Sequence, residues 1–380
     1  MTVVRNSWKF SRYLSFDKLT MKSALSLGNV SGIKVSIHWT FLLLIVWIVV
    51  QNLREGASAG PILWTLLFVG SIFVCVVLHE LGHAFAARQY GIRTRDITLY
   101  PIGGVARLES IPRKPKEELV VALAGPLVNL VIAGLLLPLA PVPQLTSQEA
   151  EIQIGPNTFL FAFAVVNAWL ALFNLVPAFP MDGGRVFRAI LSFWMDRPQA
   201  TRVAATFGQV IAVIFIFLGF YVNPFLVFIG LFIILGAQAE ANYASTEALM
   251  EGHTVMDLTM HEMPVVKPET TVGEMIREIL NTQKKNFVVA DDSLVLGVIS
   301  QMDVIKALGD KGDQLTVRDC MQTDILYLPS GLPVNEAIIK MQSSGKSIAL
   351  VKEGEAVVGM VDNDNLVEFV LIQRARQHLR

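Results

Sequence analysis

The sequence predicts a polytopic α-helical membrane protein with about six transmembrane helices and a C-terminal α/β domain made of two similar copies. Apolar residues make up 53% of the 380 residues and charged residues only 17%, which is outside the usual range of soluble proteins. Long apolar runs recur up to residue 240, and the remainder is acidic and internally repeated. We expect an N-terminal cytoplasmic segment (1–36), a membrane domain (37–245) and two repeated domains (250–312 and 313–374).

Six apolar runs are expected to cross the membrane. They cover residues 37–53, 61–87, 118–140, 157–180, 203–221 and 224–240. With the N-terminus inside, the inward segments carry 17 Lys and Arg residues and the outward segments only Arg54, as the positive-inside rule requires. We therefore expect a multi-pass protein of the plasma or inner membrane whose N-terminus and C-terminal domains are cytoplasmic. No cleavable signal peptide is expected, and a start at Met21 would make residues 1–20 an extension.

Charge and cysteine content narrow the function classes. Residues 1–250 carry 18 Lys and Arg against 13 Asp and Glu, whereas residues 251–380 carry 13 against 19. A basic-flanked membrane domain with an acidic tail gives no reason to expect a nucleic-acid partner. The two cysteines, Cys75 and Cys320, lie in different domains and predict no disulfide framework.

Ionisable side chains interrupt the second apolar run as His79-Glu80-Leu81-Gly82-His83. Such groups cost several kcal/mol each at membrane depth unless they are paired, hydrated or bound to a metal. Positions i and i+4 share one helix face, so both imidazoles can bind one cation. Glu80 can then accept a proton from water, as in the H-E-x-x-H arrangement of zinc peptidases. The pattern predicts one Zn²⁺ per chain.

A zinc site with two histidines needs a third protein ligand. The fourth run crosses in the same direction as the second and ends N-L-V-P-x-x-P-M-D-G-G, where Asp182 is the only carboxylate at comparable depth. Pro177 and Pro180 are expected to break the helix, and Gly183-Gly184 to allow a sharp turn. Alternatively, Asp182 is a helix terminator paired with the arginine three residues later.

With these motifs the chain resembles the site-2 protease family of intramembrane zinc metalloproteases. Residues 100–105 (Tyr-Pro-Ile-Gly-Gly-Val) resemble the family's membrane-associated hairpin, and residues 124–129 (Ala-Gly-Pro-Leu-Val-Asn) its Gly-Pro-x-x-Asn stretch. The resemblance covers residues 33 to 240. It implies that Asp182 is the third zinc ligand and that substrates are single-span or membrane-anchored proteins cut at or near the bilayer. Met181 departs from the Pro or Leu found in many relatives.

An extended substrate in apolar surroundings needs backbone partners, which the edge of a hairpin can supply. We expect strands at 96–100 and 105–109 around the turn 101–104, with Gly103 and Gly104 at the substrate; an ordinary cytoplasmic loop is the alternative. Asn129 and Asn174 could hydrogen-bond the substrate backbone or the developing oxyanion, or could bridge helices as packing amides.

The tail is a gapless duplication in which residues 255–312 and 317–374 align at a constant offset of 62. Each copy predicts a helix (271–282; 333–344), two strands (286–291 and 294–300; 347–352 and 355–361) and a second helix.

This pattern resembles a tandem pair of CBS domains, small β-α-β-β-α modules that often bind adenine nucleotides between the copies. The resemblance implies that Ser300 holds phosphate and Asp303 the ribose hydroxyls of such a nucleotide. Asp362 replaces the hydroxyl residue in the second copy and would repel phosphate, so at most one good site is expected. Homodimerisation through the pair, or contact with substrate, is the alternative role.

The sequence therefore favours an intramembrane zinc endopeptidase that performs regulated intramembrane proteolysis and is modulated by nucleotide or conformational change at the CBS pair. A CBS-regulated membrane transporter is one alternative, but the spans lack the inverted repeats expected of it. A non-catalytic membrane-protein binder is another, and it would not need the base Glu80.

Overall fold

The computed structural model describes residues 24–101, 103–108, 112, 114–142, 154–292 and 294–377. They form two compact units that divide between Ser245 and Thr246. The expected extension 1–20 lies outside the described residues, as do Ile102 and Glu109 of the expected hairpin.

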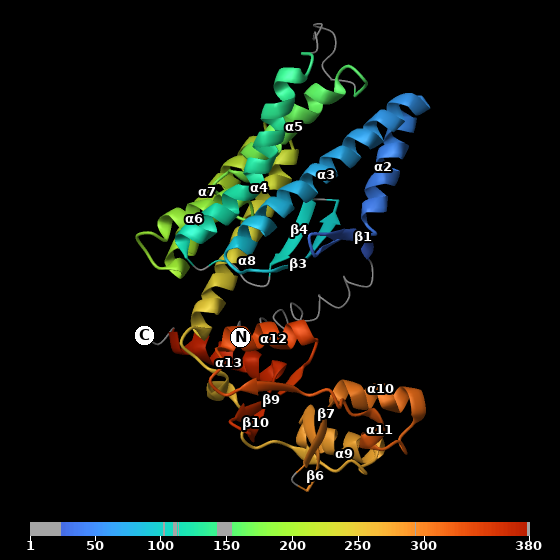
Figure 1. Ribbon diagram of the computed structural model, residues 1–380, viewed down its shortest axis with the longest axis vertical. Helices are drawn as coiled ribbons and strands as arrows, with labels where there is room; N and C mark the ends of the chain where they lie inside the picture. Colours follow the sequence, from blue (N-terminus) through green and yellow to red (C-terminus); the bar gives the residue numbers. More distant parts are fainter. Residues whose placement is uncertain are drawn as a thin grey trace. The chain divides into compact units, whose positions relative to one another are not determined.

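Apolar helices occupy all six predicted runs (Figure 1). They are α2 (Phe41–Arg54), α3 (Ala59–Gln89), α4 (Pro115–Leu136), α5 (Phe159–Asn174), α7 (Arg197–Gly219) and α8 (Phe225–Met250). Among the described residues, α3, α4, α7 and α8 are long and apolar enough to cross a membrane. With 14 and 16 residues, α2 and α5 extend only about 21 and 24 Å at 1.5 Å per residue, less than the roughly 30 Å of hydrocarbon. That they complete six spans therefore stays a prediction.

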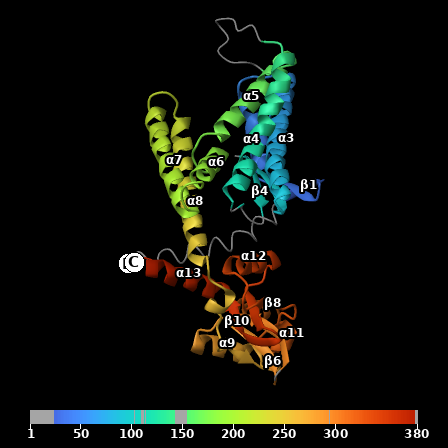
Figure 2. The same cartoon turned by 60° about the vertical axis from the view of Figure 1, so that its left-hand side comes forward.

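The helices α3, α4 and α5 pack side by side (Figure 2). Gly82 permits this packing, because a Cβ at this position would lie 2.8 Å from the carbonyl oxygen of Ala124. The glycine of the histidine motif is therefore needed for the close approach of α3 and α4, which places both histidines against α4.

The fourth apolar run breaks earlier than expected, because α5 ends at Asn174 and a separate helix, α6 (Asp182–Leu191), begins eight residues beyond it. The broken helix predicted from the two prolines is confirmed. Neither Gly183 nor Gly184 has a positive φ, so the sharp turn expected here depends on their lack of a side chain and not on left-handed backbone. A Cβ at either position would collide with the backbone of the preceding turn, so both are needed for space.

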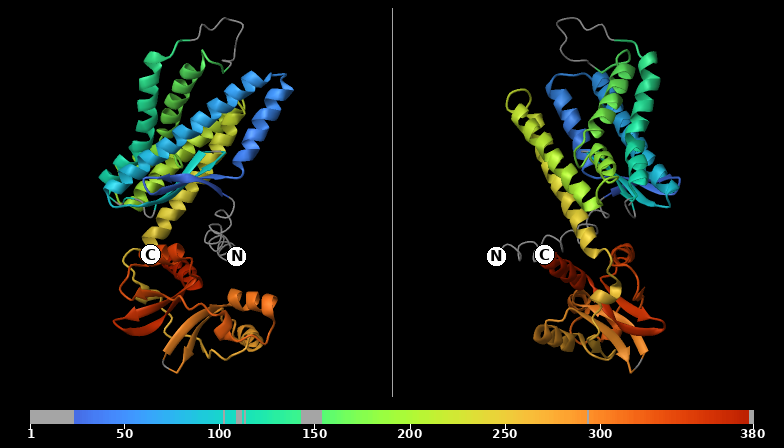
Figure 3. Two further views of the ribbon diagram at one scale, coloured as in Figure 1. Left: turned by 45° about the vertical axis from the view of Figure 1, so that its right-hand side comes forward. Right: turned by 90° about the vertical axis from the view of Figure 1, so that its left-hand side faces the viewer.

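A four-stranded sheet packs on the part of α3 that carries the histidines (Figure 3). Its order is β1 (Ala24–Val30), β2 (Ile33–His38), β3 (Thr94–Tyr100), β4 (Gly103–Leu108), with β2 and β3 parallel and the other pairs antiparallel. Leu81 and Ala84 of α3 bury Ile33 and Ile97 of the sheet.

The predicted hairpin is confirmed as β3–β4, but its turn is shorter than expected, because Gly103 and Gly104 already pair with Tyr100 and Leu99. The strands β1 and β2 were not predicted. All but the first residue of β1 are exposed, so this strand buries no apolar face. The alternation Ile33, Val35 and Ile37 in β2 is a signal that could have found that strand.

The predicted tight connection between the last two runs is confirmed by α7 and α8, which form an antiparallel pair (Figure 2). Asn223 caps α8 by accepting a hydrogen bond from Phe225 N at 2.9 Å. Gly230 allows close packing, since a Cβ there would lie 2.7 Å from the carbonyl oxygen of Ala212. α8 continues ten residues past the predicted end at 240 and finishes at Met250.

The C-terminal unit holds two copies of one α/β motif. The first copy comprises η2 (Val255–Leu258), β5 (Val265–Val266), α9 (Val272–Thr282), β6 (Asn286–Asp291), β7 (Leu294–Ser300) and α10 (Gln301–Lys311). The second comprises α11 (Val317–Cys320), β8 (Leu326–Pro329), α12 (Val334–Ser344), β9 (Ile348–Glu353), β10 (Ala356–Asp362) and α13 (Asn363–Gln377).

The two copies bury apolar side chains against each other. One cluster joins Val288 and Val298 of the first copy to Ile348, Leu350 and Met360 of the second. This shared core explains why the motif occurs as a pair, because each sheet covers a face that the other would leave open. The predicted fold class, helical membrane domain plus α/β pair, is confirmed.

Candidate metal centre

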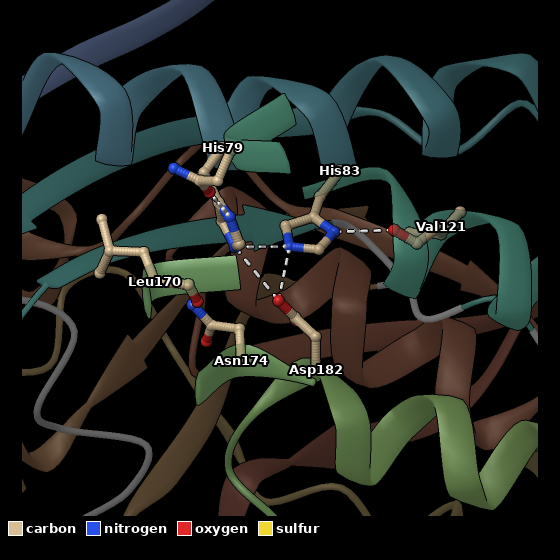
Figure 4. Close-up of polar contacts among 7 residues, drawn as sticks. His79, His83, Val121, Leu170, Asn174 and Asp182 are labelled. Atoms are coloured by element: carbon tan, nitrogen blue, oxygen red, sulfur yellow. Dashed lines mark hydrogen bonds and ion pairs between the residues drawn. The ribbon is translucent and has the colours of Figure 1, made fainter. Parts of the chain in front are cut away.

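Three buried side chains from α3 and α6 converge on one point (Figure 4). The Nε2 atoms of His79 and His83 each lie 3.1 Å from Oδ2 of Asp182, and 3.1 Å from one another. The three residues are 6–7% exposed. α3 supplies both imidazoles from one face, and Asp182 enters as the first residue of α6.

The hydrogen bonds made by the Nδ1 atoms of the two histidines decide whether their Nε2 atoms carry a proton or a lone pair. Nδ1 of His79 donates to Oδ1 of Asn129 at 2.6 Å, and Nδ1 of His83 donates to the carbonyl oxygen of Val121 at 2.7 Å. A neutral imidazole that donates through Nδ1 carries a lone pair on Nε2. Three acceptors therefore meet at 3.1 Å with no proton between them, an arrangement that a cation stabilises.

The spacing and donor set fit Zn²⁺. Ligand bonds of 2.0–2.1 Å in tetrahedral geometry separate neighbouring ligand atoms by about 3.3 Å, close to the distances observed. Two imidazoles and one carboxylate leave one position for water or substrate, the composition of a catalytic site.

Gly125 of α4 keeps the space beside the two imidazoles open. A Cβ at this position would overlap Nε2 of both His79 and His83. The glycine of the Gly-Pro-x-x-Asn stretch is therefore required by the centre itself. Sequence reasoning singled out the stretch without finding this role.

Asn129 is turned toward His79. Its side chain is 1% exposed, and its Nδ2 donates to Oδ1 of Asn167 at 2.9 Å while its Oδ1 accepts from the histidine. Asn167 is fully buried and donates to the carbonyl oxygen of Phe163. The two amides orient the metal-facing histidine, so the structure favours a helix-bridging role for Asn129 over substrate contact. Asn167 was missed, although an amide in an apolar run is the kind of signal that could have found it.

The remaining predicted residues of the membrane domain lie around the centre. Glu80 is half-buried, and a Cβ on Gly104 would lie 2.9 Å from its Cγ, so the start of β4 runs directly beside this carboxylate. Gly103 has φ 140°, a conformation that other residues rarely adopt. Asn174 lies near the centre and donates to the carbonyl oxygen of Leu170 at 2.9 Å (Figure 4).

The predicted nucleotide residues cap a helix. The hydroxyl of Ser300 donates to Oδ2 of Asp303 at 2.6 Å, and Asp303 N donates back to that hydroxyl at 3.2 Å. Nε2 of Gln322 also donates to Asp303. At the equivalent place in the second copy, the buried carboxylate of Asp362 accepts from Nδ2 of Asn286 at 2.7 Å.

A buried His₂Asp cluster between apolar helices, followed by a duplicated α/β unit, defines a membrane protein with a candidate metal centre. The Peptidase family M50 model matches residues 67–144 and 139–218, and the CBS domain model matches residues 255–310 and 317–372. The chain belongs to peptidase family M50, the site-2 proteases, and carries tandem CBS domains.

Two relatives are similar to this chain over nearly their whole length. A zinc metalloprotease of Methanocaldococcus jannaschii is 30% identical over 361 residues, which cover 95% of this chain and 100% of the relative. Rip3 of Mycobacterium tuberculosis is 30% identical over 382 residues, 94% of this chain and 95% of the relative. Among solved structures, the site-2 protease from Methanocaldococcus jannaschii is 37% identical and covers 57% of this chain and 95% of that chain, with a TM-score of 0.43.

Proposed function

We propose that this chain cleaves peptide bonds of single-span or membrane-anchored proteins, with His79, His83 and Asp182 as zinc ligands and Glu80 as general base. The observation that carries the proposal is the convergence of three buried lone-pair acceptors at 3.1 Å, each imidazole held through its Nδ1. A structural ion pair would not need two histidines oriented in this way.

Zinc, when bound, supplies a Lewis acid that polarises the scissile carbonyl and makes water more acidic. The chain itself orients the ligands: Asn129 and the carbonyl of Val121 hold both imidazoles with Nε2 toward the centre. Glu80, next to the first ligand, takes a proton from the attacking water and delivers it to the leaving amine nitrogen.

The sheet edge offers a place for the substrate. β4 is the last strand in the order β1-β2-β3-β4, so among the described residues one of its edges is not paired with another strand. An extended substrate segment that adds to this edge obtains backbone hydrogen bonds in apolar surroundings. Because Gly104 lies against Glu80, a segment on this edge would pass close to the catalytic carboxylate. Gly103 and Gly104 serve this approach by having no side chains.

The C-terminal pair is proposed to be a cytoplasmic regulatory module. The charge asymmetry of the segments between spans supports a cytoplasmic N-terminus and tail in a plasma or inner membrane. We place an adenine nucleotide at Ser300 and Asp303 of the first copy only, because Asp362 puts a carboxylate at the equivalent place in the second. Homodimerisation through the pair stays a prediction.

The test is co-expression of the full chain with tagged single-span proteins, comparing the wild type with Glu80→Gln. Glu55→Gln is a matched control, since Glu55 is an exposed carboxylate at the end of α2. We expect fragments with the wild type and the control and none with Glu80→Gln, while all three proteins retain zinc. Equal processing by the wild type and Glu80→Gln would contradict the proposal, as would an absence of zinc in the purified wild type.

A further inference from the structure

A second cluster of buried charges lies in the membrane domain and takes no part in the proposed chemistry. Arg188 of α6 is 1% exposed, although arginine is among the residues that are hardest to bury. Its Nε and Nη2 both donate to Oε1 of Glu118 on α4, at 2.8 and 2.5 Å. Its Nη1 donates to Oε1 of Glu240 on α8, at 2.6 Å. One guanidinium thus joins three helices.

The cluster connects the parts of the chain that carry the metal centre. Arg188 follows Asp182 by six residues on α6, about 9 Å along the helix axis. Its guanidinium also lies 5.1 Å above the ring of Phe179, in the turn that leads into Asp182. Glu118 precedes Val121, the acceptor for His83, by less than one turn of α4. The ion pair therefore connects α6, which carries Asp182, to α4, the helix whose residues orient the histidines.

We propose that Arg188 is a positioning residue that holds Asp182 in coordinating position relative to His79 and His83. The inference rests on the proposed function, because it assigns how that site keeps its geometry. The planar fork of Arg188 engages two carboxylates at once, which a lysine in its place does not reproduce. Without it, α6 loses its fixed distance from α4, and the third ligand loses its register with the other two.

The two carboxylates have unequal parts. Glu118 receives two hydrogen bonds and its side chain is 3% exposed, whereas Glu240 receives one and its side chain is 20% exposed. Glu118 is therefore the stronger partner of Arg188, and Glu240 the weaker one.

The experiment measures metal binding in the purified full-length chain. The variants are Arg188→Met, Arg188→Lys, Glu118→Gln and Glu240→Gln, with Arg202→Met, an exposed arginine of α7, as control. The readouts are the zinc Kd from competition with a chelator, the visible spectrum of the cobalt(II)-loaded protein, and the unfolding temperature of the metal-free protein. We expect Arg188→Met to weaken zinc binding 10- to 100-fold, the range typical for loss of a residue that supports metal ligands. The same variant should alter the cobalt spectrum. Glu240→Gln should raise the zinc Kd less than tenfold, and the zinc Kd of the control should stay within twofold of the wild-type value.

A metal-free Arg188→Met protein that unfolds at the wild-type temperature, with unchanged zinc Kd and cobalt spectrum, would overturn the inference. Should Arg188→Met fail to fold, Glu118→Gln and Glu240→Gln decide: unchanged zinc Kd and cobalt spectrum in both overturns it, and weakened binding in a folded Glu118→Gln protein supports it. Cleavage is assayed separately. A wild type that binds zinc but cuts nothing contradicts the proposed function, while the metal readouts still judge the role of Arg188.

Discussion

Replacing Asn129 with alanine tests whether the amide pair behind His79 maintains the metal centre. The substitution removes the acceptor that Nδ1 of His79 uses at 2.6 Å and the donor that Asn167 accepts at 2.9 Å. His79 is 7% exposed, so the freed N–H has little access to water. A buried donor without an acceptor costs about 1–3 kcal/mol, which corresponds to roughly a 5- to 150-fold change in a binding constant. We expect the zinc Kd to rise within this range.

The assay is competition for zinc between a chromogenic chelator and the purified full chain. Asn52→Ala is the matched control, because Asn52 of α2 donates only a local hydrogen bond, to the carbonyl oxygen of Ile48. The unfolding temperature of each metal-free protein shows whether the fold survives. A zinc Kd within threefold of wild type for a folded Asn129→Ala protein would refute the reasoning that this amide orients the ligand.

Three further outcomes are expected. Gly125→Ala should abolish zinc binding, measured as metal per chain, because its Cβ would overlap both imidazoles; Gly134→Ala, in open space on the same helix, should leave the metal content unchanged. In the C-terminal unit, hydrogen bonds from the backbone and hydroxyl of the capping threonine hold the pKa of Glu274 below its ordinary value of 4.5. The ionised Glu274 therefore stabilises the fold above pH 4.5, and this stabilisation is lost as the pH falls from 4.5 through the lower pKa of the folded state. The stability of Glu274→Gln should accordingly depend less on pH between these two values. Calorimetric titration with ATP should give one binding site per chain, and Ser300→Ala should weaken binding at this site. A second site in the wild type would contradict the proposal that Asp362 repels phosphate in the second copy.

The sequence was most informative about elements whose structure depends on the residue pattern of a single short segment. Apolar runs located the helices of the predicted spans, and the duplication at an offset of 62 located one helix and two strands in each copy of the second unit to within about one residue. The short elements that lead into each copy, such as β5 and β8, were not predicted. The two successful predictions depend on periodicity and on contacts within short segments, which the order of residues already contains. The hairpin β3–β4 was also found, although Gly103 and Gly104 entered the strand because backbone pairing continued up to the turn.

By itself, the sequence determined the membrane class, the i, i+4 pair that turns two imidazoles to one helix face, and the paired α/β tail. Only the tertiary structure showed that Asp182 meets that pair, that Asn129 and Asn167 support His79, and that Gly125 leaves room for the centre. These contacts join residues 38 to 103 positions apart, so they depend on how the helices pack and in which register. The buried bonds from Arg188 to Glu118 and Glu240 belong to the same class, since nothing local in α6 indicates which helices its arginine will reach.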